Sequence, residues 1–150
     1  MSSPTPIAPQ VMGYQYDQLN RLIGTVSSVD LDETNNEWLD NATEPINHYS
    51  EVYSYDANGY ITELRRRDQS GTFMDDLDYH YATGYQNRLE YVDDAAGVTM
   101  VTDLGDQASG NYGYDAIGQL TSDVAEDISA INWTPSGKVE SIESVTLPET

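Results

Sequence analysis

The stretch Tyr53–Leu64, YSYDANGYITEL, places two runs of alternating side chains on either side of a polar tetrapeptide. In an extended run, tyrosines two residues apart lie on the same face of the strand. Asp56 fits the first position of a type I turn, and Gly59 fits the fourth position, where a positive φ closes the turn. The stretch therefore predicts a β-hairpin with a type I turn and a bulge, in which Tyr55 faces Ile61.

The same pattern occurs at four other places in the chain. It reads YQYDQLNRL at 14–22, YGYDAIGQL at 112–120 and, more loosely, INWTPSGKV at 131–139. A degraded copy at 79–89, YHYATGYQNRL, has Ala82 in place of the aspartate and a turn two residues longer. We take the repeat-defining structural positions to be Tyr14, Tyr16, Asp17, Asn20, Leu22, Tyr53, Tyr55, Asp56, Gly59, Ile61, Tyr79, Tyr81, Leu89, Tyr112, Tyr114, Asp115, Gly118, Leu120, Trp133, Pro135, Gly137 and Val139.

The repeated turn also predicts which side chains meet across each hairpin. An aromatic residue opposite a branched aliphatic residue stabilises an antiparallel pair by roughly 0.2–1 kcal/mol relative to alanine. Because the turn is the same, Gly59 and Gly118 should both have positive φ. The expected further pairs are Tyr16 with Leu22, Tyr114 with Leu120, and Trp133 with Val139.

The chain is thus expected to be all-β, an antiparallel ribbon of hairpins that forms a curved or spiralling sheet. We predict one repeat domain over 11–143, after a disordered lead-in at 1–10 that contains three prolines, and before a tail at 144–150. The acidic segment 30–45 has no clear period and could hold a short helical turn at Glu37–Leu39. The expected hairpins cover about 11–29, 46–68, 72–94, 111–124 and 128–142.

Composition limits the classes of partner. With 26 acidic and 6 basic residues the net charge is -20, so a nucleic acid backbone would be repelled. No apolar run reaches the roughly 20 residues of a membrane helix, and the first residues lack the features of a signal peptide. The absence of cysteine excludes disulfides, thiol catalysis and thiolate metal sites. Twelve tyrosines against one phenylalanine suit surfaces that are half packed and half wet.

Two groups of acidic residues resemble cation-binding sites. Asp30, Asp32 and Asn35 resemble the start of a calcium loop, but the glycine and the final glutamate of such a loop are missing. The acidic groups at 75–78 and 93–94 could chelate a cation, or could be charged positions that face outward from strands. We therefore expect no metal site and no cofactor.

Other polar groups have ordinary explanations as well. His48 and His80 lie in strand-like runs, and we expect half-exposed histidines rather than metal ligands or catalysts. The Arg65–Arg67 cluster should neutralise acids on neighbouring strands, with recognition of an acidic partner as the alternative. Two glycosylation patterns occur, at Asn41 and Asn132, and the second is discounted because it lies inside a hairpin. The final LPET is either a processed sortase-type signal or tag, or a chance sequence.

The series of motifs YxYDxxGxL, together with the stretch ISAINWTPSGKVESI at 128–142, resembles the YD repeats of the Rhs family. That family includes bacterial Rhs and wall-associated proteins, the C component of Tc toxins, and the shells of teneurins. The resemblance implies a long hairpin ribbon that spirals into a hollow shell around a cargo polypeptide. The family's core-ending segment, with its aspartyl self-cleavage site and variable toxin, has no counterpart in this chain, so neither activity is carried over.

From these observations we expect a non-catalytic structural segment of a secreted or cell-surface bacterial protein. Its partners would be further YD repeats or copies of itself, joined through sheet edges, with an enclosed cargo polypeptide as a further candidate. The alternative is a carbohydrate-binding module in which exposed tyrosines stack on sugars. An enzyme ranks third, because no catalytic motif is recognised in the sequence.

Overall fold

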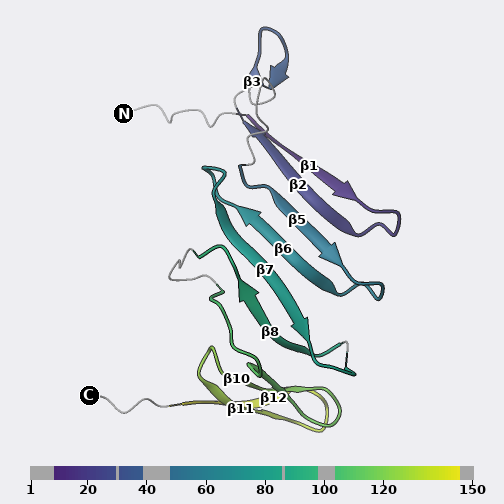
Figure 1. The fold of residues 1–150 in the computed structure, drawn as a ribbon, viewed down its shortest axis with the longest axis vertical. Helices are drawn as coiled ribbons and strands as arrows, with labels where there is room; N and C mark the ends of the chain where they lie inside the picture. Colours follow the sequence, from purple (N-terminus) through teal and green to yellow (C-terminus); the bar gives the residue numbers. More distant parts are fainter. Residues whose placement is uncertain (1–8, 30, 39–47, 86, 98–103, 146–150) are drawn as a thin grey trace, which may run out of the picture. The chain divides into compact units, whose positions relative to one another are not determined.

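The computed structural model describes residues 9–29, 31–38, 48–85, 87–97 and 104–145. Every regular element in these ranges is a β-strand, and the strand pairs are antiparallel, as the sequence predicts. The chain divides into two compact units, 1–76 and 77–150, at a point inside one strand, whereas the sequence analysis treats 11–143 as one domain. We describe the two units separately (Figure 1).

The first unit is built on two hairpins and the beginning of a third. Its strands are β1 (Gln10–Tyr16), β2 (Leu22–Val29), β5 (Glu51–Tyr55), β6 (Ile61–Arg67) and the first residues of β7 (Phe73–Tyr81). In the sheet β1 lies beside β2, β2 beside β5, and β5 beside β6. Gln10, which the sequence analysis places in the lead-in, is the first residue of β1; residues 1–8 lie outside the described ranges.

The acidic segment after β2 forms a small hairpin of its own. Strand β3 (Leu31–Asp32) pairs with β4 (Glu37–Trp38), with Leu31 opposite Trp38. The expected helical turn at Glu37 and Trp38 is therefore wrong. Asp32 begins a turn in which Asn36 has a φ of 55°, and this turn returns the chain in an extended conformation.

The second unit contains the rest of β7, which pairs with β8 (Leu89–Asp94), and a four-stranded sheet. The strands of that sheet are β9 (Tyr112–Tyr114), β10 (Leu120–Asp123), β11 (Ile128–Trp133) and β12 (Val139–Ser144). They follow one another in sequence order, with β9 and β12 at the two edges. Figure 1 shows this sheet in green to yellow.

The register of every repeated hairpin matches the one expected from the turn. A bulge adjoins each of these pairs, as the turn type requires. Gly59 and Gly118 have φ of 93° and 94°, which confirms the predicted backbone at both positions. The observed pairs are Tyr16 with Leu22, Tyr55 with Ile61, Tyr81 with Leu89, Tyr114 with Leu120, and Trp133 with Val139.

Few hydrophobic side chains are fully buried among the described residues of either unit. Among the described residues, the buried hydrophobic side chains are Leu77, Val92 and Ile131, and all three belong to the second unit. The buried residues of the first unit in those ranges are polar: Thr25, Ser27, Ser50 and Asp75, apart from a glycine at position 24. The first unit therefore depends on hydrogen bonds and half-buried tyrosine rings, because it has little fully buried apolar surface.

Candidate functional site: the junctions between hairpins

The aspartate that opens each turn organises the backbone of that turn. The carboxylate of Asp56 accepts hydrogen bonds from the backbone N–H groups of Asn58 and Tyr60, at 2.9 and 2.8 Å. Asp17 and Asp115 accept the equivalent pairs of bonds in their own turns. The Arg21 backbone N–H, which bonds to the carboxylate, lowers the pKa of Asp17 below its ordinary value. Each aspartate thus holds its turn together, and Asp17 does so best when it is ionised.

A further turn of this kind, not predicted from the sequence, connects β6 to β7. It covers residues Asp68 to Gly71, and the Asp68 carboxylate accepts the backbone N–H groups of Ser70 and Thr72. Gly71 has a φ of 80°. The signal was present in the sequence as DQSG, but no Tyr-x-Tyr precedes it, so it was not recognised as part of the series.

The aromatic residue before each turn links its hairpin to the one before it in the chain. In the first unit, the Tyr55 hydroxyl donates to the Leu22 carbonyl on β2 at 2.7 Å. In the second unit, the Trp133 indole N–H donates to the Leu120 carbonyl on β10, also at 2.7 Å. In the same unit, burial raises the pKa of Tyr114 above its ordinary value, against the opposing effect of the Leu89 backbone on β8. In both hydrogen bonds the backbone partner is the residue that follows the turn of the preceding hairpin, and Leu89 occupies the same position relative to Tyr114.

An arginine strengthens the junction between the first two hairpins. Arg21 lies directly before Leu22, and its guanidinium carbon is 4.7 Å from the centre of the Tyr55 ring. The same guanidinium donates to the Asp56 carbonyl at 3.1 Å and to the Asp17 carboxylate at 2.7 Å. One cation therefore connects the turn of the first hairpin to the aromatic ring and turn of the second.

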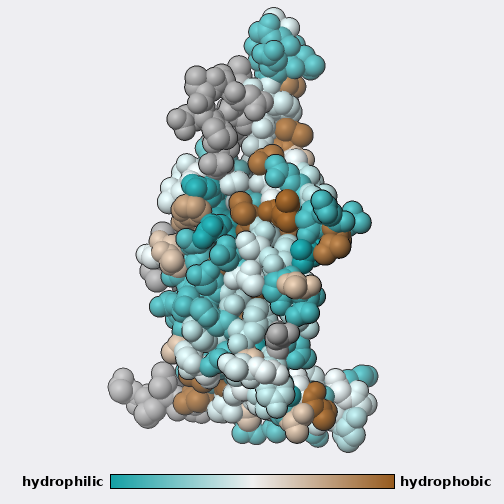
Figure 2. Space-filling model, turned by 45° about the vertical axis from the view of Figure 1, so that its right-hand side comes forward, coloured by the Kyte–Doolittle hydropathy of each residue, from teal (hydrophilic) through white to brown (hydrophobic). Residues whose placement is uncertain are grey.

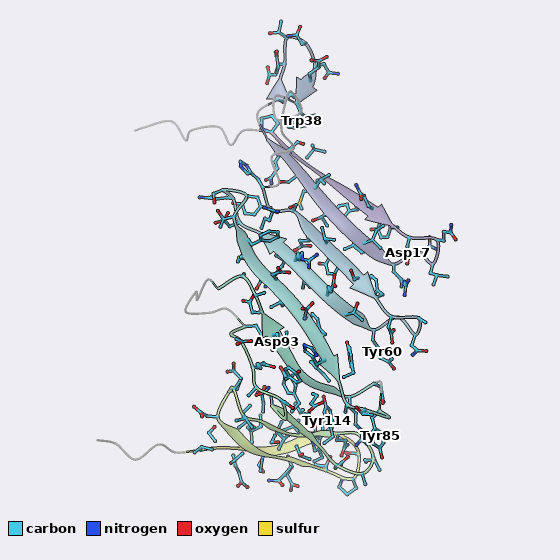
Figure 3. The ribbon with its side chains drawn as sticks, in the orientation of Figure 1. Asp17, Trp38, Tyr60, Tyr85, Asp93 and Tyr114 are labelled. Carbon is cyan, nitrogen blue, oxygen red and sulfur yellow. The ribbon has the colours of Figure 1, made fainter. Side chains whose placement is uncertain are left out.

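The second unit repeats this arrangement at Arg88, which lies directly before Leu89. Its guanidinium carbon is 4.5 Å from the ring centre of Tyr85 and 5.7 Å from that of Tyr114, and Figure 3 shows these two tyrosines close together. The guanidinium also donates to the Ala116 carbonyl in the next turn, at 3.4 Å. Both copies of the sequence NRL thus place an arginine on the following hairpin.

The Arg65–Arg67 cluster neutralises acids on β7, as expected for two of its members. The Arg65 guanidinium lies 2.6 Å from the Asp76 carboxylate, and Arg66 forms an ion pair with Asp75. Arg67 lies over the Phe73 ring and donates to the Gly71 carbonyl.

Of the two explanations for the acids at 75–78, the one in which they are charged positions that face outward does not hold for Asp75. Its side chain is 0% exposed, and its Oδ1 atom has no hydrogen-bond partner within the described part of the chain. A carboxylate removed from water needs a counter-charge, so Asp75 depends on Arg66.

A tyrosine and a glutamate on β5 form a second polar pair. The Tyr53 hydroxyl donates to the Glu51 carboxylate at 2.8 Å. Burial and this bond to Glu51 raise the pKa of Tyr53 to about 12. The proton of Tyr53 is therefore held on the ring oxygen, which suits a structural hydrogen bond rather than proton transfer near neutral pH.

The two histidines are placed as half-exposed strand and turn residues. The Nε2 atom of His80 is 2.9 Å from the Asp93 carboxylate, and its ring stacks on Tyr91 with centres 4.2 Å apart. The His48 carbonyl accepts a hydrogen bond from the Ser27 hydroxyl. No group of three or more histidines, aspartates and glutamates in the described ranges could hold a metal ion.

The remaining sequence candidates are accounted for locally or lie outside the described ranges. The Asp32 carboxylate is occupied by hydrogen bonds from Thr34 and Asn35. The Asn132 amide donates to Ser141 and Glu143 on β12. Asp30, Asn41 and the final LPET lie outside the described residues.

The surface of the first unit has a shallow hollow of about 340 Å³ between β2 and β5 that extends to β6. Its lining is mixed, with Val52 and Phe73 beside Glu51 and Arg67. Figure 2 likewise shows hydrophobic residues in separate groups among hydrophilic ones on the face in view.

The strand edges differ in how they are covered. At β8, Gln107 pairs with Val92: the Gln107 backbone N–H donates to the Val92 carbonyl, and its side-chain oxygen accepts the Val92 N–H at 3.0 Å. This residue occupies hydrogen-bonding groups that another strand would need. By contrast, six of the seven residues of β1 and all six of β12 are exposed.

No family model matches the chain, and a search of curated proteins finds no match. Within the described ranges, no helix is long and apolar enough to cross a membrane. The features available for a functional argument are therefore the hairpin junctions and the exposed edges.

Proposed function

We propose that this chain is a non-catalytic structural segment of a bacterial protein of the Rhs YD-repeat type, secreted or exposed at the cell surface. In this role its hairpins form part of a β shell or surface assembly that encloses or displays a cargo polypeptide. The segment associates with further repeats, or with copies of itself, through its sheet edges.

The observation that carries the proposal is the junction contact that recurs at equivalent positions. Tyr55 and Trp133 each donate to the backbone carbonyl of the preceding hairpin at the residue that follows its turn. A hairpin whose aromatic residue finds its hydrogen-bond partner only in the preceding hairpin gains stability when hairpins are stacked in a series. A scaffold of repeats needs this property, and in the proposed function the tyrosine-rich motif provides it by joining each hairpin to the preceding one.

The association of the purified chain tests this proposal. Mutual repulsion at a net charge of -20 is screened over about 8 Å at physiological salt, so pairing of edges should increase as salt is added. We expect light scattering to report oligomers or filaments, with a larger mean mass at high salt than at low salt. A strictly monomeric mass across that range would contradict the proposal. So would turnover on a panel of ester, glycoside and peptide substrates that a single Asp or Glu substitution abolishes.

A carbohydrate-binding function is the second candidate, because Tyr14 and Tyr16 on β1 are 56% and 58% exposed and two residues apart. Aromatic rings exposed in this way can stack on sugar rings. A glycan array separates the two functions: binding that Tyr14→Ala abolishes would favour the carbohydrate module. A blank array combined with salt-dependent association would favour the scaffold.

A further inference from the structure

The exposed strands β1 and β12 carry complementary halves of the junction seen inside each unit. Tyr16 on β1 occupies the position of Tyr55, but its hydroxyl has no hydrogen-bond partner among the described residues, and the residue is 58% exposed. Val139 on β12 occupies the position of Leu22 and is 48% exposed. Strand β1 thus has a hydroxyl donor without an acceptor, at Tyr16. Strand β12 has the backbone position that would accept such a bond, at Val139, without a donor.

A cation completes the match. Lys138 directly precedes Val139, as Arg21 directly precedes Leu22, and it is the only lysine of the sequence. Its side chain is exposed, and its ammonium group has no ion-pair partner within the described ranges. The arginines at two of the internal junctions each contact the ring and a turn carbonyl of the following hairpin. Lys138 is positioned to make the same contacts with Tyr16 and the adjoining turn, where Asp17 supplies a negative charge.

We propose that β12 of one copy of this chain pairs antiparallel with β1 of a second copy. In this interface the Tyr16 hydroxyl donates to the Val139 carbonyl, and Lys138 lies over the Tyr16 ring. The inference rests on the proposed scaffold function and specifies the partner and the strands. The interface joins two different surfaces, so one copy can continue to bind a next one.

The junction between β2 and β5 supplies the register. There Thr25 lies opposite Glu51, and Gly24 lies opposite Val52. Transferring these positions to β12 and β1 places Ile142 opposite Met12, and Ser141 opposite Gly13. The β10–β11 junction is the poorer template, because β11 has a bulge near its first residue that β1 lacks.

This register also gives the interface an apolar contact. Met12 is 43% exposed and Ile142 is 57% exposed, and pairing would cover both side chains. A slip by one residue would turn Met12 and Ile142 to opposite faces of the sheet. The pair therefore provides a strict test of the register.

Cysteine cross-linking tests the interface cleanly, because the chain contains no cysteine. We would mix two single variants, Met12→Cys and Ile142→Cys, one of them enlarged by a tag, and oxidise the mixture gently. Directly opposite residues of an antiparallel pair have Cα atoms roughly 4.5–5.5 Å apart, which lies within the range for a disulfide. We expect the mixed dimer to dominate over both homodimers. The matched control mixes Met12→Cys with Ser141→Cys, whose side chains should lie on opposite faces, and we expect little mixed dimer.

A second arm measures association without any covalent bond. Tyr16→Phe should raise the dissociation constant about fivefold, the effect of one neutral hydrogen bond of roughly 1 kcal/mol. Tyr14→Phe is the control, since this tyrosine lies on the same strand at the position of Tyr53, whose hydroxyl bonds within its own strand. We expect its dissociation constant to equal that of the unaltered chain.

Four outcomes would overturn the interface. Equal cross-linking of the slipped control would mean random collision, and dominant homodimers would mean a symmetric contact. A Met12→Cys, Ile142→Cys double variant that forms only a monomeric disulfide would mean that β12 pairs with β1 of its own chain. Salt-dependent oligomers without the mixed disulfide would overturn this interface but leave the scaffold function standing. By contrast, the mixed disulfide together with specific catalytic turnover would overturn the scaffold function and leave the interface standing.

Discussion

The first two hairpins share the motif Tyr-x-Tyr-Asp, yet the same tyrosine has two different environments in them. Tyr55 on β5 is half-buried, donates to the Leu22 carbonyl and lies beneath the Arg21 guanidinium. Tyr16 on β1 is 58% exposed and makes none of these contacts. Both residues face a branched aliphatic partner within their own hairpin, Ile61 or Leu22. The motif therefore forms the hairpin by itself, whereas the preceding hairpin determines whether its aromatic residue is half-buried and hydrogen-bonded or exposed.

The largest loss of stability should follow from removing the arginine on β6 that neutralises the buried Asp75 carboxylate. Arg66→Leu leaves the Asp75 carboxylate, which is 0% exposed, without its cation. We expect a loss of roughly 3–5 kcal/mol in the free energy of unfolding, measured by urea denaturation. Arg65→Leu is the matched control: its ion pair with Asp76 is 43% and 29% exposed, and its loss should cost at most about 1 kcal/mol.

A double variant checks the cause of that loss. If the uncompensated charge is responsible, Arg66→Leu with Asp75→Leu should recover most of the stability. A double variant as unstable as Arg66→Leu alone would assign the loss to packing around the arginine instead.

The next largest effect should come from truncating the two tyrosines themselves. Tyr55→Ala removes a half-buried ring, a hydrogen bond and the platform of Arg21, so we expect it to lower the free energy of unfolding by about 2–3 kcal/mol, somewhat less than a fully buried aromatic residue. Tyr16→Ala should cost less than about 1 kcal/mol in the monomer. Equal losses for the two variants would show that the neighbouring hairpin contributes nothing, and would erase the distinction.

The turns provide a smaller and more local comparison. Gly59 has a φ of 93°, which a β-branched residue avoids, whereas Asn20 has a φ of 60°, within the range that asparagine tolerates. Gly59→Val should therefore destabilise by more than about 1 kcal/mol, and Asn20→Gly should be close to neutral. Thermal melting of both variants checks this. A Gly59→Val variant that melts with the unaltered chain would contradict the turn geometry.

The sequence was sufficient for features that depend on a few consecutive residues. The pair Tyr55 and Ile61 and the φ of Gly59 follow from turn chemistry that acts within a hairpin, so their prediction was accurate. The Tyr55 bond to Leu22 was not predicted, because the two residues are separated by a segment of variable length and no local rule relates them. Burial of Asp75 was missed for a related reason: alternation along a strand separates its two faces but does not say which face is covered. Trp38 was misassigned because two-residue strands carry no period.

The stability of the first two hairpins should respond alike to acid but differently to alkali. The Arg21 N–H lowers the pKa of Asp17. Burial acts to raise the pKa of Asp56, but the N–H groups of Tyr60 and Asn58 outweigh it and leave that pKa lowered too. A lowered carboxyl pKa contributes stability above the unfolded value of 3.8, and this stability is lost as pH falls through the folded value. Both hairpins should therefore weaken together in acid.

At high pH the second hairpin should respond through a group with a shifted pKa. Burial and the Glu51 bond raise the pKa of Tyr53 from 10.0 to about 12, so its contribution is complete below pH 10 and disappears as pH rises toward 12. We expect the free energy of unfolding, measured in urea at stepped pH, to fall across that window, and Tyr53→Phe to flatten the fall. Tyr14→Phe, the same change at the equivalent position of β1, should leave the slope in place. The opposite result is that Tyr14→Phe removes the alkaline fall in stability and Tyr53→Phe does not. It would mean that the hydroxyl responsible lies on the exposed strand β1 and not on β5.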